Sequence, residues 1–470
     1  MSAASPLAPG WLLPPADANG LASAVWPAAA SRRDDGQLEL GGVAARDIAA
    51  RYGTPVLVLD EDEVRGRARA TRAAFEDAAA RHGTRARVYY AGKAFLSTEV
   101  ARWVTQEGLR VDVCTRGELE VALAAGIPAD ELGFHGNNKS VSELERAVEV
   151  GIGSIVIDSV WELERLAAIV ARRGAQQAVL LRVNSGVHAE THHFLATSHE
   201  DQKFGFALED APALVARVRE TPGLDLVGLH CHIGSQIFGT EGFRASAARL
   251  LAVLAQLPGG PLPVLNLGGG FGIAYTAADE PTPIAELAEG IVSVVASEAQ
   301  NLGIPVPSLA FEPGRSVVGT AGVTLYEIGT TKDVSVETPE GPAVRRYVSV
   351  DGGMSDNPRP ALYDAQFSAR IADRTSDAPP ALVRVVGKHC ESGDIVVDAE
   401  YLPADVAPGD LLAVPATGAY CYALASNYNH VPRPPIVAVR AGESRVIVRG
   451  ETIDDLLARD SGYAGPRGDR

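Results

Sequence analysis

The chain has 470 residues, of which 46% are hydrophobic and 21% charged, as in an ordinary globular protein of two or three domains. Its formal net charge of −17 argues against a protein that binds a nucleic-acid backbone. No apolar run approaches the roughly 18 residues of a membrane helix, and no positively charged start precedes an apolar run as in a signal peptide.

The N-terminal part divides into two segments. Residues 1–36 are rich in Ala and Pro and predict a loose arm. Residues 37–61 include a strand-like run, Val56–Asp60. We expect this run to join a β domain formed mainly by the C-terminal part of the chain.

Residues 62–321 alternate short apolar runs with longer amphipathic stretches at helical spacing. The runs are eight: Arg87–Ala91, Arg110–Cys114, Leu132–His135, Ser154–Asp158, Val179–Val183, Leu226–His230, Val264–Leu267 and Ser308–Phe311. Eight such alternations predict a (β/α)8 barrel of the TIM type. A doubly wound open sheet is the alternative, and the count of strands alone does not exclude it.

Residues 322–470 predict a second, all-β domain. Their apolar runs are short and are separated by Gly, Pro and Asp turns, which is typical of an antiparallel barrel or sandwich. The runs are Val323–Ile328, Tyr347–Val350, Leu382–Val386, Ile395–Val397, Leu411–Val414, Ile436–Val439 and Arg445–Val448.

Chemically versatile residues gather where the predicted barrel strands end. They are Lys93, Asp112, His135, Asp158, Asn184, His232, Gly268–Gly270 and Glu312–Arg315. Barrels collect their reactive groups at the carboxyl ends of the strands, so these residues predict a functional rim. Strands that merely end in polar loops would explain some of them, but not a lysine, a histidine pair, a triple glycine and an EPGR together.

Lys93 follows the first barrel strand, in the motif VYYAGKAF. A lysine amine with a lowered pKa forms a Schiff base with an aldehyde. A solvated surface lysine is the commoner alternative, so the motif gains weight only from its neighbours on the rim.

Two further strand ends predict an anion site. The run Gly268-Gly269-Gly270 allows backbone N–H groups to close around an anion, although its spacing is not that of a dinucleotide fingerprint. The segment HCHIGS places an aromatic ring, His232, and a hydroxyl, Ser235, on the rim.

The eighth strand ends in Glu312-Pro313-Gly314-Arg315. A carboxylate here could keep a pyridine nitrogen protonated, which makes the ring a strong electron sink. The arginine offers a planar fork for a carboxylate or phosphate. An internal Glu–Arg ion pair is the alternative interpretation.

The cysteines are Cys114, Cys231, Cys390 and Cys421. Without an export signal they predict free thiols and a cytoplasmic protein, and no CxxC or HExxH spacing predicts a metal. Cys390 lies between His389 and Glu391 in a polar, glycine-containing segment, where a thiol could donate a proton.

The motifs in their order resemble the fold type III pyridoxal-phosphate-dependent decarboxylases and, among them, the diaminopimelate decarboxylases. They are YAGKAF, HGNNKS, HEDQKFG, GLHCHIGSQ, LGGGFG, EPGR, SVDGGMSDNPRPALY, GKHCESGD and ATGAYCYALASNYN, and they run from about residue 38 to the end of the chain. The resemblance implies decarboxylation of meso-2,6-diaminopimelate to L-lysine and carbon dioxide, the last step of lysine biosynthesis, by a homodimer with shared active sites.

The resemblance also implies residue roles. Lys93 and Cys390 are the catalytic pair, Lys93 holding pyridoxal 5'-phosphate and Cys390 donating the proton. The implied cofactor site comprises Lys93, Asp112, His232, Ser235, Gly268, Gly269, Gly270, Glu312, Pro313, Gly314, Arg315 and Tyr420, with His232 against the ring and Glu312 at its nitrogen. The implied substrate site comprises Arg315, Arg359, Tyr363, Glu391 and Tyr420.

The distal end of diaminopimelate carries both an anion and a cation, and Arg359 and Glu391 would bind one each. Three alternatives remain open. A related decarboxylase for ornithine, arginine or carboxynorspermidine has no evident need of Arg359. A racemase needs a second base, typically a tyrosine, where this chain offers Cys390. A non-catalytic pyridoxal-phosphate carrier would have no need of the substrate residues.

Overall fold

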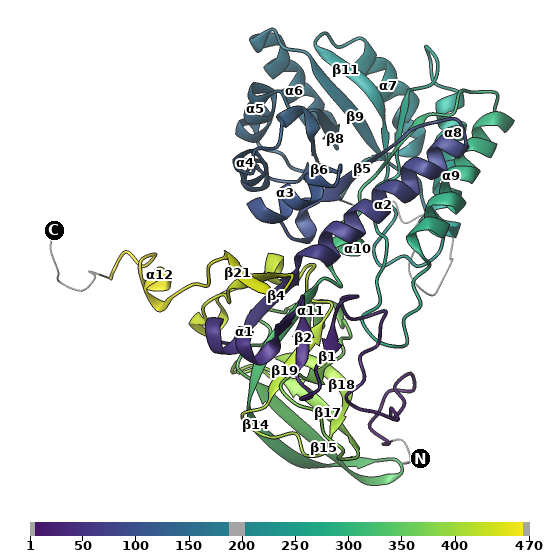
Figure 1. Ribbon diagram of the computed structural model, residues 1–470. Coiled ribbons are helices and arrows are strands. Elements are labelled where there is room, and N and C mark those ends of the chain that lie inside the picture. The colour runs from purple at the N-terminus through teal and green to yellow at the C-terminus, as the bar shows by residue number, and fades with distance from the viewer. Residues whose placement is uncertain (1–4, 188–202, 464–470) are drawn as a thin grey trace. The chain divides into compact units, whose positions relative to one another are not determined.

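The computed structural model describes residues 5–187 and 203–463 (Figure 1). The chain folds into two compact units. The barrel unit comprises residues 65–273 and 281–317. The β unit comprises the residues before 65, residues 274–280 and those from 318 onward.

Eight parallel strands of the described chain close a ring in the barrel unit, because β8 pairs with β9 as well as with β7. In ring order from the first, they are β5 (Ala86–Ala91), β6 (Arg110–Val113), β7 (Leu132–Phe134), β8 (Ser154–Ile157), β9 (Gln177–Asn184), β11 (Leu224–His230), β12 (Val264–Asn266) and β13 (Ser308–Phe311), and β13 pairs with β5. The predicted barrel is therefore confirmed, and the open-sheet alternative is wrong. The short β10 (Phe206–Ala207) pairs in parallel with the last two residues of β9, Val183 and Asn184.

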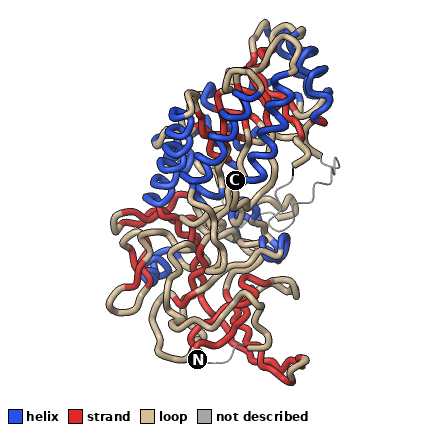
Figure 2. Tube along the Cα trace, turned by 90° about the vertical axis from the view of Figure 1, so that its right-hand side faces the viewer, coloured by secondary structure: helices blue, strands red, loops and turns tan. Residues whose placement is uncertain are grey.

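Helices alternate with these strands and cover them, as Figure 2 shows in blue around red. They are α2 (Glu61–Arg81), α3 (Thr98–Gln106), α4 (Arg116–Ala124), α5 (Val141–Val150), α6 (Val160–Arg173), α7 (Ala211–Arg219), α8 (Glu241–Ala255), α9 (Ile284–Asn301) and the short α10 (Arg315–Val318). Side-chain caps start several of them directly after a strand-end loop. Ser140 accepts from the backbone N–H of Glu143 at α5, and Ser159 accepts from that of Glu162 at α6.

The barrel core is aromatic as well as aliphatic. The rings of Phe75 on α2 and Phe311 on β13 stack at 3.8 Å between centroids, and Phe271 lies 5.4 Å from Phe75. All three side chains are buried. This packing fixes the eighth strand, whose end carries the EPGR motif, against the helical layer.

The β unit is built around a sheet with the strand order β18-β17-β15-β14-β4-β20-β21, to which β19 and β16 are attached. Its strands are β4 (Val56–Asp60), β14 (Gly322–Thr338), β15 (Gly341–Val350), β16 (Arg370–Ile371), β17 (Pro380–Val386), β18 (Ile395–Pro403), β19 (Leu411–Pro415), β20 (Ile436–Arg440) and β21 (Glu443–Val448). Figure 1 shows β14 and β15 side by side as a long hairpin.

The sheet is mixed rather than purely antiparallel, which corrects the sequence-based expectation. β15 pairs parallel with β17, and β4 pairs parallel with β20. Parallel neighbours need a long crossover, and residues 351–379 supply one that includes α11 (Arg359–Tyr363). β4 lies between β14 and β20, so the strand before the barrel joins the β unit.

The segment before β4 carries little regular structure. It contains β1 (Ser31–Arg32), β2 (Leu38–Leu40) and β3 (Val43–Ala44), which form a small sheet, and α1 (Ala45–Tyr52). Val25 and Trp26 are buried, so the part of the predicted loose arm that the structure describes packs through its apolar side chains. The short α12 (Ile453–Leu457) follows β21. Within the described residues, no helix is both long enough and apolar enough to cross a membrane.

Candidate functional site

Four strand ends of the barrel meet at the carboxylate of Glu312, which follows β13. Its Oε1 accepts from Nδ2 of Asn266 at 2.6 Å and lies 3.2 Å from Nε2 of His135. Its Oε2 lies 3.2 Å from Nε2 of His230. Asn266 ends β12, His230 ends β11 and His135 follows β7, so the closed ring of strands creates this cluster.

Glu312 is an ionised carboxylate. Burial would raise its pKa, but the two histidines and their hydrogen bonds hold the pKa well below the ordinary value. Burial lowers the pKa of His230 to about 4, so this imidazole is neutral at pH 7. A carboxylate only accepts, so Nε2 of His230 carries the proton, which agrees with a buried Nδ1 that has no partner among the described residues.

His135, His230 and Glu312 offer ligand atoms within 4.8 Å of one another. Nitrogen and carboxylate donors of this kind also bind metals. The hydrogen bonds that orient Glu312 account for this cluster without a metal ion.

Asp112 is the third residue of β6, in the same ring, and its side chain is buried. Burial raises the pKa of its carboxyl to about 7, while His135 and Lys93 lower it and Glu312 raises it. Its Oδ1 has no hydrogen-bond partner among the described residues. The rim therefore holds one carboxylate that is ionised and a second that titrates near neutrality.

Lys93 lies in the short turn Gly92–Ala94 that follows β5. The residue is exposed, whereas Gly92 and Ala94 on either side are buried. Its positive charge lowers the pKa values of Asp112 and His232, which places the amine within electrostatic reach of both. The lysine is thus held on a fixed turn and presented towards the rim.

The triple glycine is required by close packing of the strand-end loops. A Cβ on Gly268 would lie 2.6 Å from the carbonyl oxygen of Cys231, and one on Gly269 or Gly270 would strike the carbonyl oxygens of Glu312 or Gly234. Gly268 and Gly270 also have φ of +69° and +107°, which favours glycine. This packing joins the ends of β11, β12 and β13.

His232 and Ser235 lie on the loop after β11. Nδ1 of His232 accepts from the backbone N–H of Gly269 at 3.3 Å, and burial lowers the pKa of His232 to about 3, so the ring is neutral. Oγ of Ser235 accepts from Nη2 of Arg315 at 2.9 Å. The hydroxyl and the guanidinium therefore stand together at the start of α10.

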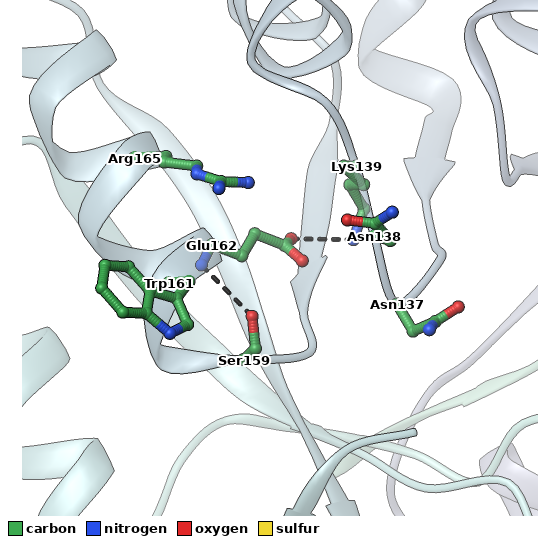
Figure 3. Close-up of a pocket in the computed structure, with 7 residues that line it drawn as sticks. All are labelled: Asn137, Asn138, Lys139, Ser159, Trp161, Glu162 and Arg165. Atoms are coloured by element: carbon green, nitrogen blue, oxygen red, sulfur yellow. Dashed lines mark hydrogen bonds and ion pairs between the residues drawn. The ribbon is translucent and has the colours of Figure 1, made fainter. Parts of the chain in front are cut away.

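A buried lysine supports the loop that carries His135. Nζ of Lys139 donates to Glu162 at 2.8 Å (Figure 3). It also donates to the carbonyl of Val156 at 2.7 Å and to that of Gly136 at 2.8 Å. A pocket of about 360 Å³ adjoins this pair and is lined by Asn137, Asn138, Lys139, Ser159, Trp161, Glu162 and Arg165. None of these seven residues belongs to the predicted cofactor set.

The β unit carries four of the five predicted substrate residues, and Arg315 belongs to the barrel unit. Arg359 begins α11 and is only 7% exposed. Its guanidinium carbon lies 4.4 Å from the ring centroid of Tyr275 and 5.4 Å from that of Phe367. Its Nη1 is buried and has no hydrogen-bond partner among the described residues. A buried guanidinium with a donor left open is suited to an incoming anion.

The remaining predicted residues of the β unit are more accessible. Cys390 and Glu391 are exposed on the loop between β17 and β18, and Tyr363, on α11, is 65% exposed. Tyr420 has a left-handed φ of +61° and is half-buried. All four cysteines are free thiols, as predicted.

The barrel unit thus brings together a set of predicted residues on one rim: Lys93, Asp112, His232, Ser235, Gly268–Gly270, Glu312, Pro313, Gly314 and Arg315. Asn266 was missed, and His230 was included only as part of the segment HCHIGS without a role of its own, although each is the last residue of a strand. The motif HEDQKFG begins in residues 188–202, which lie outside the described residues.

Comparison with known proteins places the chain in a family. A model of the pyridoxal-binding domain of pyridoxal-dependent decarboxylases matches residues 62–319. Diaminopimelate decarboxylase of Mycobacterium tuberculosis (strain H37Rv) is 52% identical over 447 residues, covering 93% of this chain and 98% of that protein. The corresponding enzyme of Bacillus subtilis (strain 168) is 45% identical over 430 residues, covering 90% and 95%.

Solved structures agree. Diaminopimelate decarboxylase of M. jannaschii in co-complex with L-lysine superposes with a TM-score of 0.84 at 30% identity, covering 92% of this chain and 98% of that one. The chain therefore belongs to the pyridoxal-dependent decarboxylases and, within them, to the diaminopimelate decarboxylase family.

Proposed function

We propose that the chain binds pyridoxal 5'-phosphate and decarboxylates meso-2,6-diaminopimelate to L-lysine and carbon dioxide. Family membership supports the reaction class, and a relative named diaminopimelate decarboxylase is 52% identical over nearly the full chain. The observation that carries the choice of substrate is the buried Arg359, whose Nη1 is open to an anion. Diaminopimelate has a distal carboxylate to fill that position, whereas ornithine has none.

The residues of the barrel rim fit the cofactor. The ionised, buried Glu312 suits a protonated ring nitrogen, and the neutral imidazole of His232 suits the face of a ring. Lys93 would hold the aldehyde carbon through its amine. The Gly268–Gly270 loop with Ser235, the EPGR backbone and, from the β unit, Tyr420 would hold the phosphate.

When bound, the cofactor supplies an electron sink for the negative charge that decarboxylation leaves on carbon. This chain's residues do the rest. Glu312 would hold a proton at the ring nitrogen, and its contacts to Asn266, His135 and His230 keep the carboxylate in one orientation. Cys390 would deliver the proton that the reacting carbon receives, from Sγ.

Arg359, with Arg315 and Tyr363, would bind the distal carboxylate, and Glu391 the distal amine. This pairing is what separates the proposed substrate from ornithine, arginine and carboxynorspermidine. A buried polar group left unpaired by the wrong substrate costs about 1–3 kcal/mol, so the pair would discriminate strongly.

We further propose a homodimer with shared sites, located in the cytoplasm. The exposure of Cys390 and Glu391 in the single chain supports sharing, because exposed catalytic and binding groups can reach the site of a neighbouring copy. Free thiols support a reducing compartment.

The test is product identification. Purified protein loaded with pyridoxal phosphate is incubated with meso-diaminopimelate, and carbon dioxide and L-lysine are quantified. Equal amounts of the two products support the proposal. Cofactor binding without either product would refute the assigned reaction while leaving the family intact.

A further inference from the structure

The loop that carries Cys390 and Glu391 is joined to neighbouring segments by two residues that have no role so far, His389 and Asn429. Oδ1 of Asn429 accepts from the backbone N–H of Cys390 at 3.2 Å and lies 3.3 Å from Nδ1 of His389. Nε2 of His389 lies 2.9 Å from Oγ of Ser355. A series of hydrogen bonds thus connects the Cys390 backbone, through an amide and an imidazole, to the hydroxyl of Ser355.

The direction of these hydrogen bonds is determined by their donors. The backbone N–H of Cys390 only donates, so the atom of Asn429 that it meets must be the amide oxygen. That oxygen only accepts, so Nδ1 of His389 carries a proton. In the neutral tautomer Nε2 of His389 then accepts from the hydroxyl of Ser355. Each of the four residues therefore has a defined donor or acceptor role, as expected of a hydrogen-bonded network that holds one geometry. We call this network of Cys390, Asn429, His389 and Ser355 the clamp.

The buried carboxylate of Asp394 also joins the loop that carries Cys390 to the loop that carries Ser355. Asp394 accepts from the backbone N–H of Met354 at 2.6 Å and from that of His389 at 2.8 Å. A Cβ on Gly353 would lie 2.5 Å from the Asp394 carboxylate, and one on Gly387 would also strike it, so two glycines form the slot around it. Burial raises the pKa of Asp394, which the two N–H groups oppose.

The clamp also reaches the predicted anion site. Ser355 lies four residues before Arg359, and its carbonyl accepts from the backbone N–H of Ser426 at 2.9 Å. Asn429 belongs to the same segment as Ser426 and has a left-handed φ of +51°. Three loops that carry the thiol, the distal carboxylate binder and Asn429 are therefore tied to one another.

We propose that Asn429 and His389 are positioning residues that hold Cys390 and Glu391 in register with the Arg359 loop through the Cys390–Asn429–His389–Ser355 chain. This inference rests on the proposed function, in which Cys390 supplies a proton and Glu391 binds the distal amine. Loss of the clamp would leave the thiol present but misplaced, which slows proton delivery more than it weakens substrate binding.

The decisive variant is Asn429→Gly, because glycine keeps the left-handed backbone and removes only the acceptor. The matched control is Asn429→Asp, which tolerates the same backbone and keeps an acceptor oxygen. Full-length protein with bound pyridoxal phosphate is compared by hydrogen–deuterium exchange of the peptide that contains Cys390, by cofactor absorbance and by kcat and KM for meso-diaminopimelate.

We expect faster exchange at the Cys390 amide and a fall in kcat of about 10- to 100-fold, the size that a misplacement of about 1 Å produces. KM should change less than threefold, cofactor absorbance should be kept, and Asn429→Asp should restore most of kcat. Unchanged exchange, or faster exchange with an unchanged kcat, would overturn the inference.

A second variant covers the case in which Asn429→Gly does not fold. Ser355→Ala removes the hydroxyl from Nε2 of His389 and should produce the same pattern in weaker form. If wild-type protein fails to decarboxylate diaminopimelate, the proposed function fails, and the exchange rates alone then decide whether Asn429 holds the Cys390 backbone. Wild-type exchange in both variants would refute the clamp.

Discussion

Replacing Arg359 by methionine should selectively damage recognition of the distal carboxylate. The guanidinium is buried against the rings of Tyr275 and Phe367, its carbon 4.4 and 5.4 Å from their centroids, and its Nη1 has no partner among the described residues. Methionine fills a similar volume and packs well against aromatic rings, so the β unit should still fold.

The expected magnitude follows from the lost hydrogen bonds. A hydrogen bond to a charged group contributes about 1.5–3 kcal/mol, which corresponds to roughly 10- to 150-fold in an equilibrium or rate constant. We therefore expect kcat/KM for meso-diaminopimelate to fall by at least tenfold in Arg359→Met. The kcat/KM of Arg359→Lys should fall less, since lysine keeps the charge but lacks the planar guanidinium fork.

The assay is release of carbon dioxide under initial-rate conditions, with cofactor absorbance measured on the same samples. Arg346→Met is the matched control, because Arg346 belongs to the β unit but pairs with Asp333 on the β14–β15 hairpin. Its kcat/KM should equal that of wild type. A folded, cofactor-bound Arg359→Met with wild-type kcat/KM would refute the assignment of Arg359 to the substrate.

Three further predictions concern the cofactor, the thiol and pH. Lys93→Ala should lose both the absorbance of bound pyridoxal phosphate and the activity; retention of either would contradict the role of Lys93. Cys390→Ala should keep the absorbance and lose most of kcat, and verified heterodimers of the two variants should regain activity if the sites are shared. Burial raises the pKa of Asp356 from 3.8 to about 7, so the folded chain binds the extra proton and the free energy of unfolding should fall as pH rises across that window. Denaturant unfolding of the apoprotein should show a shallower fall in Asp356→Asn, and equal slopes would contradict this.

The barrel was predictable because its strands correspond to short apolar runs at regular intervals in the sequence, each followed by an amphipathic stretch. All eight runs overlap strands of the ring. The pairing within the β unit was less predictable. Parallel neighbours such as β15 and β17 depend on how a long crossover folds back, and the apolar pattern of a strand does not encode the direction of its partner.

The sequence predicted which residues belong to the site better than it predicted which of them contact one another. Strand-end position alone pointed to Glu312, but its contacts to Asn266 and His230 arise from three-dimensional closure of the ring, which brings together residues 46 and 82 positions apart in the chain. Asn429 lies in a region of Asn and Tyr without periodicity, and only the structure shows its amide against the Cys390 backbone.

The most direct test of the central claim is a competition experiment. Holoenzyme is incubated with equimolar meso-diaminopimelate, L-lysine, L-ornithine and L-arginine, and the loss of each amino acid is followed by mass spectrometry. The account predicts that only meso-diaminopimelate is consumed and that L-lysine accumulates in equal amount. Consumption of ornithine or arginine in its place would contradict the distal-site assignment of Arg359 and Glu391, and with it the proposed substrate.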